Sequence, residues 1–210
     1  MKSDVSAGPI GIMADSHGRC SLIEEAAALL RGMGCGRLFH LGDICDSGMP
    51  ETARECVRFV RELSIEAVKG NNDHILVVNQ KGNGRPAVDR ITLDFLAELP
   101  PLLEVGSMAF THSLPFYSWM GAAALMRVPE DGERSLMFYG NPYSVIFRGH
   151  SHRPEYFRLE GDAIDGAVMK PGDAVGLSKG SRYVFTCGAL IEGFALTLDR
   201  EKEEVRCHSL

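Results

Sequence analysis

A short apolar run ends on a polar motif at Ile10-Gly11-Ile12-Met13-Ala14-Asp15-Ser16-His17. A helical pattern follows, because Ser21-Leu22-Ile23-Glu24 has the form of a capping box and the pattern continues to about Met33. The segment is therefore predicted to form a strand, a loop and a helix. Asp15 and His17 stand two apart at the end of the strand, where an extended backbone would place both side chains on one side.

The same unit recurs further along the chain. Residues 37–41 form an apolar run that ends on Gly42-Asp43, and residues 50–63 then show a helical pattern. Residues 65–69 form a third run, which ends on Gly70-Asn71. Three successive strands would thus each carry a polar motif at the carboxyl end, which is the edge where open α/β sheets bind ligands.

The rest of the chain predicts shorter elements. Residues 81–85 are Gly-rich and are expected to form a surface loop, and residues 114–143 are expected to form a helix-containing excursion near the site. A short helix is predicted over residues 93–99, closed by Pro100-Pro101. Strands are predicted over 102–105, 108–111 and 144–148 and, as antiparallel strands, over 156–159, 183–186, 194–198 and 205–208.

Size and charge limit the classes of function. The 210 residues, 45% of them hydrophobic, suit one domain over 1–210 with residues 1–8 flexible. A net charge of -6 argues against a protein that holds long nucleic acid, since that task needs a dense basic surface. No apolar stretch has the length of a signal peptide or a bilayer span, so the chain is predicted to be cytoplasmic, with no membrane partner.

The six cysteines lack both CxxC spacing and the density of a disulfide scaffold, and most are expected to be reduced structural thiols. Cys45 lies inside a polar motif and is interpreted as a packing residue.

Five motifs in fixed order carry the chemistry. They are Asp15-Ser16-His17, Gly42-Asp43-Ile44-Cys45-Asp46, Gly70-Asn71-Asn72-Asp73, Thr111-His112-Ser113 and Gly149-His150-Ser151-His152. Each motif alone also fits a turn carboxylate or a core histidine, but their joint placement at strand ends favours a shared site. The oxygen and nitrogen ligand candidates suit a pair of divalent metals that activates water against a phosphate ester. They are Asp15, His17, Asp43, Asn71, His112, His150 and His152.

From about Ile10 to Arg153 these motifs resemble the calcineurin-like metallophosphoesterase superfamily, especially its small bacterial single-domain phosphodiesterases. The resemblance implies an α/β (α+β) fold, a four-layer αββα sandwich with a dinuclear metal site at one sheet edge. Mn is the favoured ion for both sites, and Zn, Fe, Ni and Co are alternatives.

The resemblance also implies a role for each ligand candidate. Asp43 would bridge the two metals, and Asp46 would orient a ligand by a hydrogen bond. His40 either supports a ligand in the same way or is a satisfied core histidine. The first metal would be held by Asp15, His17 and His152, and the second by Asn71, His112 and His150.

Two departures from the family pattern bear on catalysis. Asn72 stands where many members have a histidine that protonates the leaving group or steadies the transition state, and an amide cannot donate a proton to the leaving group. Phosphomonoesters with poor leaving groups should suffer most. His74 either replaces that histidine or is a surface residue at a helix start. Arg19 replaces a common Asn and either holds two phosphate oxygens in fork geometry or is solvated.

Further residues have open interpretations. Arg148 and Arg153 flank the histidine pair and either meet substrate or are exposed arginines near a turn. The aromatic cluster Phe116, Tyr117 and Trp119 forms either a wall for a base or aryl group or a small satellite core. Residues 186–189 replace the family's late Gly-Ser turn, which weakens any transfer of substrate contacts there.

The predicted function is hydrolysis of phosphodiesters by a metal-bridging hydroxide, with Asp43, Asn71, Asn72, His74 and Arg19 as the catalytic candidates. The expected substrate is a small phosphate ester. One alternative is a phosphomonoesterase or nucleotide phosphatase on the same site. Another is a non-catalytic scaffold, as the retromer scaffold subunit exemplifies in this superfamily. Residues 114–143 and the C-terminal turns could also pair two subunits into a homo-oligomer.

Overall fold

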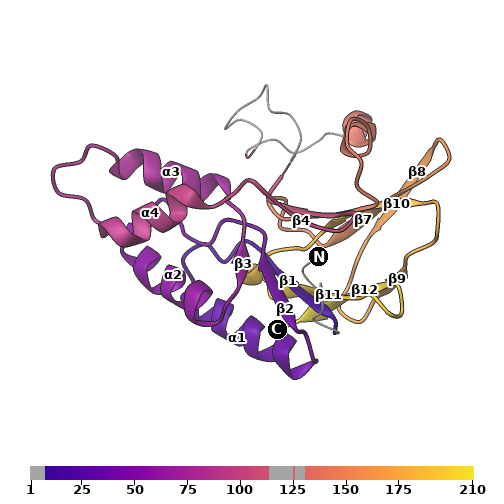
Figure 1. Ribbon diagram of the computed structural model, residues 1–210, viewed down its shortest axis with the longest axis horizontal. Coiled ribbons are helices and arrows are strands. Elements are labelled where there is room, and N and C mark those ends of the chain that lie inside the picture. Colours follow the sequence, from indigo (N-terminus) through magenta and orange to yellow (C-terminus); the bar gives the residue numbers. More distant parts are fainter. Residues whose placement is uncertain (1–7, 114–124, 126–130) are drawn as a thin grey trace, which may run out of the picture.

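Two six-stranded sheets form the centre of the computed structural model, which describes residues 8–113, 125 and 131–210 (Figure 1). The first sheet has the spatial order β3 (Glu66–Ala67), β2 (Arg37–His40), β1 (Ile10–Met13), β11 (Phe194–Asp199), β12 (Glu204–Ser209) and β9 (Ala174–Gly176). The second has the order β4 (Leu102–Val105), β5 (Met108–Thr111), β6 (Val145–Arg148), β10 (Arg182–Thr186), β7 (Glu155–Glu160) and β8 (Ala163–Val168). Strands β1, β2 and β3 are parallel, and so are β5, β6 and β10.

Alternating side chains of the strands divide the core. Ile12 of β1 faces the second sheet, whereas its neighbour Met13 faces the helices. Between the sheets, Phe39 stacks on Phe110 with ring centroids 4.0 Å apart, and Phe147 lies in the same apolar cluster. The sheets are therefore joined face to face by a dry core.

Helices cover the outer face of the first sheet. They are α1 (Cys20–Gly32) and α2 (Ala53–Glu62), while α3 (Asn71–Gln80) and α4 (Arg90–Glu98) lie beyond the β3 edge at the left in Figure 1. A buried apolar stripe of α1, including Ile23 and Leu30, packs in one cluster with Val57 and Val60 of α2. The 3₁₀ helices η1 (Pro50–Thr52) and η4 (Leu190–Glu192) lead into α2 and β11.

The outer face of the second sheet is covered by the end of the 3₁₀ helix η3 (Asp131–Met137), where Met137 and Phe138 pack on Ala109 and Ile146. The four layers confirm the predicted αββα class. The rest of the predicted excursion over 114–143 lies outside the described residues, except Leu125 and 131–143, and the flexible start lies outside them except Gly8. The single-domain organisation stays a prediction.

Several elements differ from expectation. Helix α1 begins at Cys20 and has no side-chain cap, so the predicted capping box at Ser21 is wrong. Strand β10 pairs parallel with β6 and antiparallel with β7, so the C-terminal strands are not all antiparallel. Of helix α3 only a start near His74 was considered, because it begins on a polar Asn71-Asn72 pair. Strands β8 and β9, which have no buried residue, were not predicted.

Cysteines follow the expectation in the main. Cys35, Cys45, Cys187 and Cys207 are free and buried. Cys20 and Cys56, however, form a disulfide that links α1 to α2, with Cα atoms 4.6 Å apart. Within the described ranges, the helices are all too short or too polar to cross a membrane.

Candidate metal centre

The predicted ligand residues meet at one edge of the two sheets. Asp15 and His17 follow β1, Asp43 follows β2 and Asn71 opens α3 after β3. The second sheet contributes the remaining histidines, which follow β5 and β6. They are His112, His150 and His152. Because parallel strands present their carboxyl ends at the same edge, residues far apart in the chain come together there.

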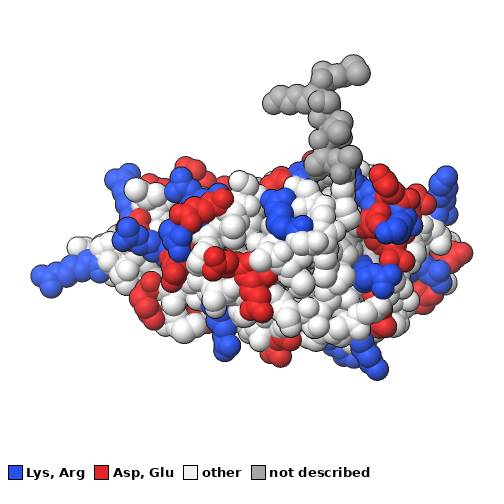
Figure 2. Space-filling model, turned by 90° about the horizontal axis from the view of Figure 1, so that it is seen from below, with Lys and Arg blue, Asp and Glu red and all other residues white. Residues whose placement is uncertain are grey.

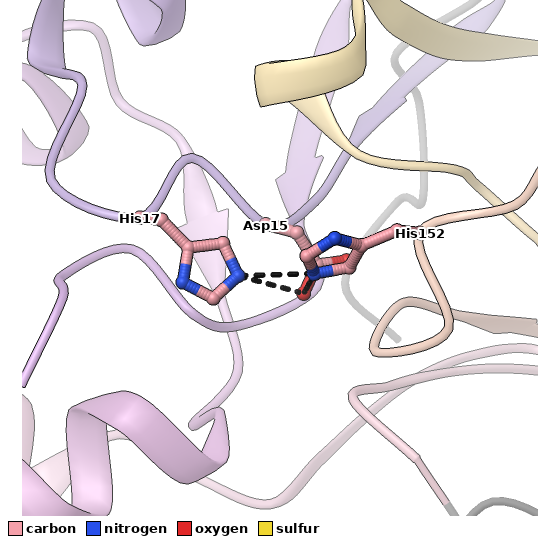
Figure 3. Close-up of side chains that lie close together, drawn as sticks. All are labelled: Asp15, His17 and His152. Atoms are coloured by element: carbon pink, nitrogen blue, oxygen red, sulfur yellow. Dashed lines mark hydrogen bonds and ion pairs between the residues drawn. The ribbon is translucent and has the colours of Figure 1, made fainter.

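One group of three surrounds the Asp15 carboxylate (Figure 3). His17 Nε2 lies 3.9 Å and His152 Nε2 lies 3.7 Å from Asp15 Oδ1. The two Nε2 atoms are 3.0 Å apart. The rings approach the carboxylate from separate loops, one after β1 and one after β6 (Figure 3). Three ligand atoms thus converge on one small space.

A second group comprises Asp43, His112 and His150. His112 Nε2 lies 3.1 Å from His150 Nδ1 and 3.6 Å from Asp43 Oδ1. The amide oxygen of Asn71 lies 2.9 Å from the same His112 nitrogen, so Asn71 joins this group. The division matches the two metal sets implied by the sequence resemblance.

Asp43 lies between the groups. Its Oδ1 faces His112 at 3.6 Å, whereas its Oδ2 faces His17 Nε2 of the other group at 3.7 Å. One carboxylate therefore presents one oxygen to each group, which is the geometry that a bridging ligand requires.

Left-handed backbone conformations aim these side chains. Among the described residues, five of the seven non-glycine residues with positive φ belong to the site. They are Asp15 (φ 56), His17 (φ 44), Asp43 (φ 53), His150 (φ 73) and His152 (φ 57). This conformation is costly for residues other than glycine and clusters at functional sites. The expected extended backbone at Asp15 and His17 is therefore wrong, and left-handed conformations at both residues direct their side chains instead.

Two positions beside the ligands have room for glycine only. A Cβ on Gly70 would lie 2.1 Å from the Asp43 backbone nitrogen, and one on Gly149 would lie 2.8 Å from Asp15 Oδ2. The loops that carry the ligands therefore pack backbone against backbone.

The buried carboxylate of Asp15 favours a bound cation in the first group. Burial and then the charge of Asp43 raise the pKa of the Asp15 carboxyl well above its usual value, against the lowering effect of the hydrogen bond from the His150 amide. Asp15 Oδ1 is buried and has no hydrogen-bond partner among the described residues. Since an uncompensated buried carboxylate is costly, a metal bound by Asp15, His17 and His152 fits the site.

His112 is prepared to bind through Nε2. Its Nδ1 lies 2.7 Å from the Leu41 carbonyl oxygen, which only accepts, so Nδ1 carries the proton and Nε2 presents a lone pair. Burial lowers the pKa of His112 to about 4, which keeps the ring neutral at pH 7. A neutral imidazole is the form that a metal requires.

Asn72 is engaged at both ends of its amide. Its Nδ2 donates to Asp43 Oδ2 at 2.8 Å, and its backbone N–H donates to Asp43 Oδ1 at 2.7 Å. Its Oδ1 accepts from the Ser47 hydroxyl at 3.0 Å. Asn72 thus holds the Asp43 carboxylate in place.

Asp73 is a supporting residue whose role was not inferred from the sequence. Its buried carboxylate accepts backbone N–H groups from Cys45 at 2.9 Å and Gly70 at 2.9 Å, with a longer bond from Ile44. It therefore joins the loop after β2 to the start of α3. The sequence signal for this role is Gly70 followed three residues later by Asp73, which is the spacing of a capping box at a helix N-terminus.

Asp46 does not lie where the resemblance placed it. The hydrogen bond of its Oδ1 comes from the Gly48 amide within its own loop. The buried carboxylate that joins the ligand loops is that of Asp73.

His40 lies under the loop between Asp15 and His17. It is fully buried, and its Nε2 lies 3.0 Å from the Ser16 hydroxyl. Burial lowers the pKa of His40 to about 3. His40 therefore supports the ligand loop through Ser16 as a neutral histidine.

Two catalytic candidates form no hydrogen bond or ion pair with a ligand residue in the described part of the chain. The Arg19 side chain is exposed at the start of α1 and makes no ion pair within the described part of the chain. His74 is partly buried in the first turn of α3, and its ring forms no hydrogen bond to a described ligand residue. Both roles stay predictions.

Of the two flanking arginines, Arg148 is buried and donates to the Ser151 hydroxyl, so it cannot meet substrate, whereas Arg153 is exposed. Cys45 packs in the core beside α2, as expected. Phe116, Tyr117 and Trp119 lie outside the described residues.

Comparisons with known proteins agree with this geometry. The family model for the calcineurin-like phosphoesterase superfamily domain matches residues 9–191. An uncharacterized protein of Methanocaldococcus jannaschii is 24% identical over 209 residues, covering 84% of this chain and 82% of that protein.

Among solved structures, a metallophosphoesterase from Sphaerobacter thermophilus is similar with a TM-score of 0.77 at 23% identity, covering 98% of this chain and 88% of that one. A structure described as a novel archaeal phosphodiesterase gives a TM-score of 0.52 at 17% identity, covering 96% of this chain and 99% of that one. At these identities the likeness concerns the fold.

Proposed function

The chain belongs to the calcineurin-like phosphoesterase superfamily, and from that membership we propose that it is a metal-dependent phosphoesterase that prefers phosphodiesters to phosphomonoesters. Two divalent ions, when bound, supply Lewis-acid stabilisation of the phosphoryl charge and a water activated as the nucleophile. Asp15, His17 and His152 would hold one ion, and Asn71 with the buried histidine pair would hold the other. Asp43 would contribute one oxygen to each.

The diester preference is supported by the engagement of Asn72. Its Nδ2 donates to Asp43 and its Oδ1 accepts from Ser47, and an amide has no acidic proton to give to a leaving alcohol. A phosphomonoester with a poor leaving group needs that proton most, because the departing oxygen would otherwise leave as an alkoxide. The residues around the ligands therefore favour esters whose leaving group departs without an acid.

The preserved ligand set favours an enzyme over a scaffold. A protein that only binds partners on this fold can lose metal ligands without harm, yet all seven candidates are present and gathered in two groups. Mn²⁺ is the proposed ion, because carboxylate, amide and imidazole ligands without thiolate suit it.

The proposed substrate is a small phosphate ester. Figure 2 shows one face of the molecule, on which acidic and basic side chains of the described residues are interspersed without a continuous basic tract. This face lacks the electrostatic footprint of a protein that holds a long nucleic acid strand.

The test is hydrolysis of bis-p-nitrophenyl phosphate beside p-nitrophenyl phosphate by metal-stripped protein resupplied with Mn, Ni, Co, Zn or Mg. The proposal expects metal-dependent cleavage with the diester well ahead. A monoester preference would keep the metal site and favour the phosphatase alternative. No turnover despite two bound ions would favour the scaffold.

Asn72→His sharpens this test. It should raise the rate with an alkyl phosphomonoester, whose leaving group is poor, relative to the diester rate, because an imidazolium can protonate the leaving oxygen. Asn79→His places the same residue on an exposed position of the same helix and should leave the ratio unchanged. An unchanged ratio in Asn72→His would show that Asn72 does not set the preference.

A further inference from the structure

A cavity of about 400 Å³ adjoins the candidate metal centre, and His152 forms part of its wall. Nε2 of the same imidazole lies 3.7 Å from Asp15 Oδ1. The His152 side chain therefore lies between the centre and the cavity. Small-molecule sites of proteins have volumes of roughly 300–1,000 Å³. An organic group attached to a phosphate at the centre would reach this cavity by passing the His152 ring.

The walls of the cavity are mainly apolar. Pro154 and Met169 are buried there, Phe194 is partly buried and Val168 is 40% exposed. Proline, phenylalanine and imidazole rings present flat surfaces, on which an aromatic group packs over a large area. The lining therefore suits a flat apolar group better than a charged one, which would lose its hydration.

The cavity is preformed. The Met169 N–H donates to the Pro154 carbonyl at 2.8 Å, which joins the end of β8 to the loop that carries His152. Gly188 has φ 79, and a Cβ on it would lie 2.9 Å from Phe194 Cβ and 3.1 Å from Pro154 Cδ. The glycine in the Thr186-Cys187-Gly188-Ala189 segment thus lets the two walls approach each other.

The rim carries both signs of charge. Arg153 and Lys170 are exposed at the cavity, and so is Glu192. Burial lowers the pKa of His152, and the nearby charge of Glu192 acts in the opposite direction. The two cations attract an anionic ester to the entrance. The carboxylate disfavours a further phosphate inside.

We infer that this cavity receives the uncharged aromatic group of a phosphate ester whose phosphate lies at the Asp15–Asp43 centre. The inference rests on the proposed function for the position of the phosphate, and it adds the class of organic group. Val168 and Phe194 then help to determine specificity by apolar contact.

The experiment measures binding rather than turnover. Calorimetric titration of the Mn²⁺-loaded protein with phenylphosphonate and methylphosphonate compares two ligands that share the phosphonate and differ in the organic group. The phenyl compound should bind about tenfold more tightly, as burial of a phenyl ring predicts. Val168→Asn, a neutral change at the cavity, should reduce this preference by about threefold.

Val78→Asn is the matched control, because Val78 is another exposed valine and lies on α3. It should keep the wild-type preference. Equal affinity for both phosphonates in the wild-type protein, an unchanged preference in Val168→Asn, or no binding of either compound would overturn the inference. Binding with the expected preference but no hydrolysis of any ester would overturn the proposed function and leave the aromatic pocket standing.

Discussion

The two ligand groups of the candidate metal centre differ in burial and in how the protein holds them. In the group around Asp15, the side chains of His17 and His152 are 17% and 36% exposed. In the group around Asp43, His112 is fully buried and Asp43 is 2% exposed, while His150 and Asn71 are partly buried. Hydrogen bonds to Leu41 and Asn72 fix His112 and Asp43 before any ion arrives, whereas left-handed conformations occur at ligands of both groups.

The two metal positions should therefore differ in how firmly they retain an ion. The buried group is preorganised and should retain its ion, because its ligands lose little freedom on binding. The open group adjoins the apolar cavity, and its two histidines are reached by solvent, so it should exchange its ion more readily. Variants in each group test whether the two metal positions differ in this way.

The largest effect is expected where the groups meet. Asp43→Asn should lower the hydrolysis rate by about 10³-fold or more, because an amide cannot supply an anionic oxygen to both groups. Rates with bis-p-nitrophenyl phosphate and metal content by mass spectrometry check this. Asp94→Asn, at an exposed position of α4, is the control. An active Asp43→Asn protein with two ions would remove the bridging role.

Asp73→Ala should come next, because three backbone N–H groups then lose their acceptor. Each buried donor left unsatisfied costs about 1–3 kcal/mol, so we expect at least about 3 kcal/mol less stability by urea unfolding. The ion of the buried group should be lost first, because Asp73 joins the loops of Asp43 and Asn71. If the ion of the Asp15 group were lost first instead, the expected difference in ion retention between the two groups would be wrong.

A pair of histidine variants compares the groups directly. His112→Gln and His17→Gln should each cost one bound ion after dialysis. In metal-free protein, however, His112→Gln should lower the free energy of unfolding by about 1–3 kcal/mol, because it loses a buried hydrogen bond to Leu41. His17→Gln should cost less than about 0.5 kcal/mol, as changes at accessible positions do. Equal destabilisation would contradict the assigned difference in burial.

The sequence predicted the ligands better than their surroundings. Apolar runs ending on Asp15, Asp43 and Asn71 gave the parallel strands and their common edge, because strand direction alone brings these ends together. The left-handed turns could not be predicted, since aspartate and histidine do not favour positive φ as strongly as glycine does. Tertiary contacts impose that conformation.

The supporting residues needed the structure. Asp46 and Asp73 both follow a ligand motif, and the choice between them depends on which backbone amides each carboxylate reaches across two loops. The aromatic-lined cavity joins residues 151–154 with 168–171 and Phe194, and strand β8, which ends there, has too few buried residues to be predicted. Local patterns carry no information on such long-range contacts.

The smallest effect expected is a pH dependence of stability. Burial lowers the pKa of His40 to about 3 in the folded protein, from an ordinary value of 6.5 in the unfolded chain. Below pH 6.5 the unfolded chain therefore binds a proton that the folded chain does not, and stability falls as the pH falls. The contribution of His40 is complete above pH 6.5 and is lost progressively toward pH 3.

His40→Gln should remove this loss, since glutamine does not titrate. Between about pH 7.5 and 5.5 the metal-free variant should lose about 1.4 kcal/mol less unfolding free energy than the metal-free wild type. His208→Gln should change the slope less, because His208 lies partly exposed on β12 and its pKa is lowered mainly by partial burial. If the slope is the same in His40→Gln and wild type, His40 is not held neutral beneath Ser16. The open group's loop would then lack the buried support that its partner group has.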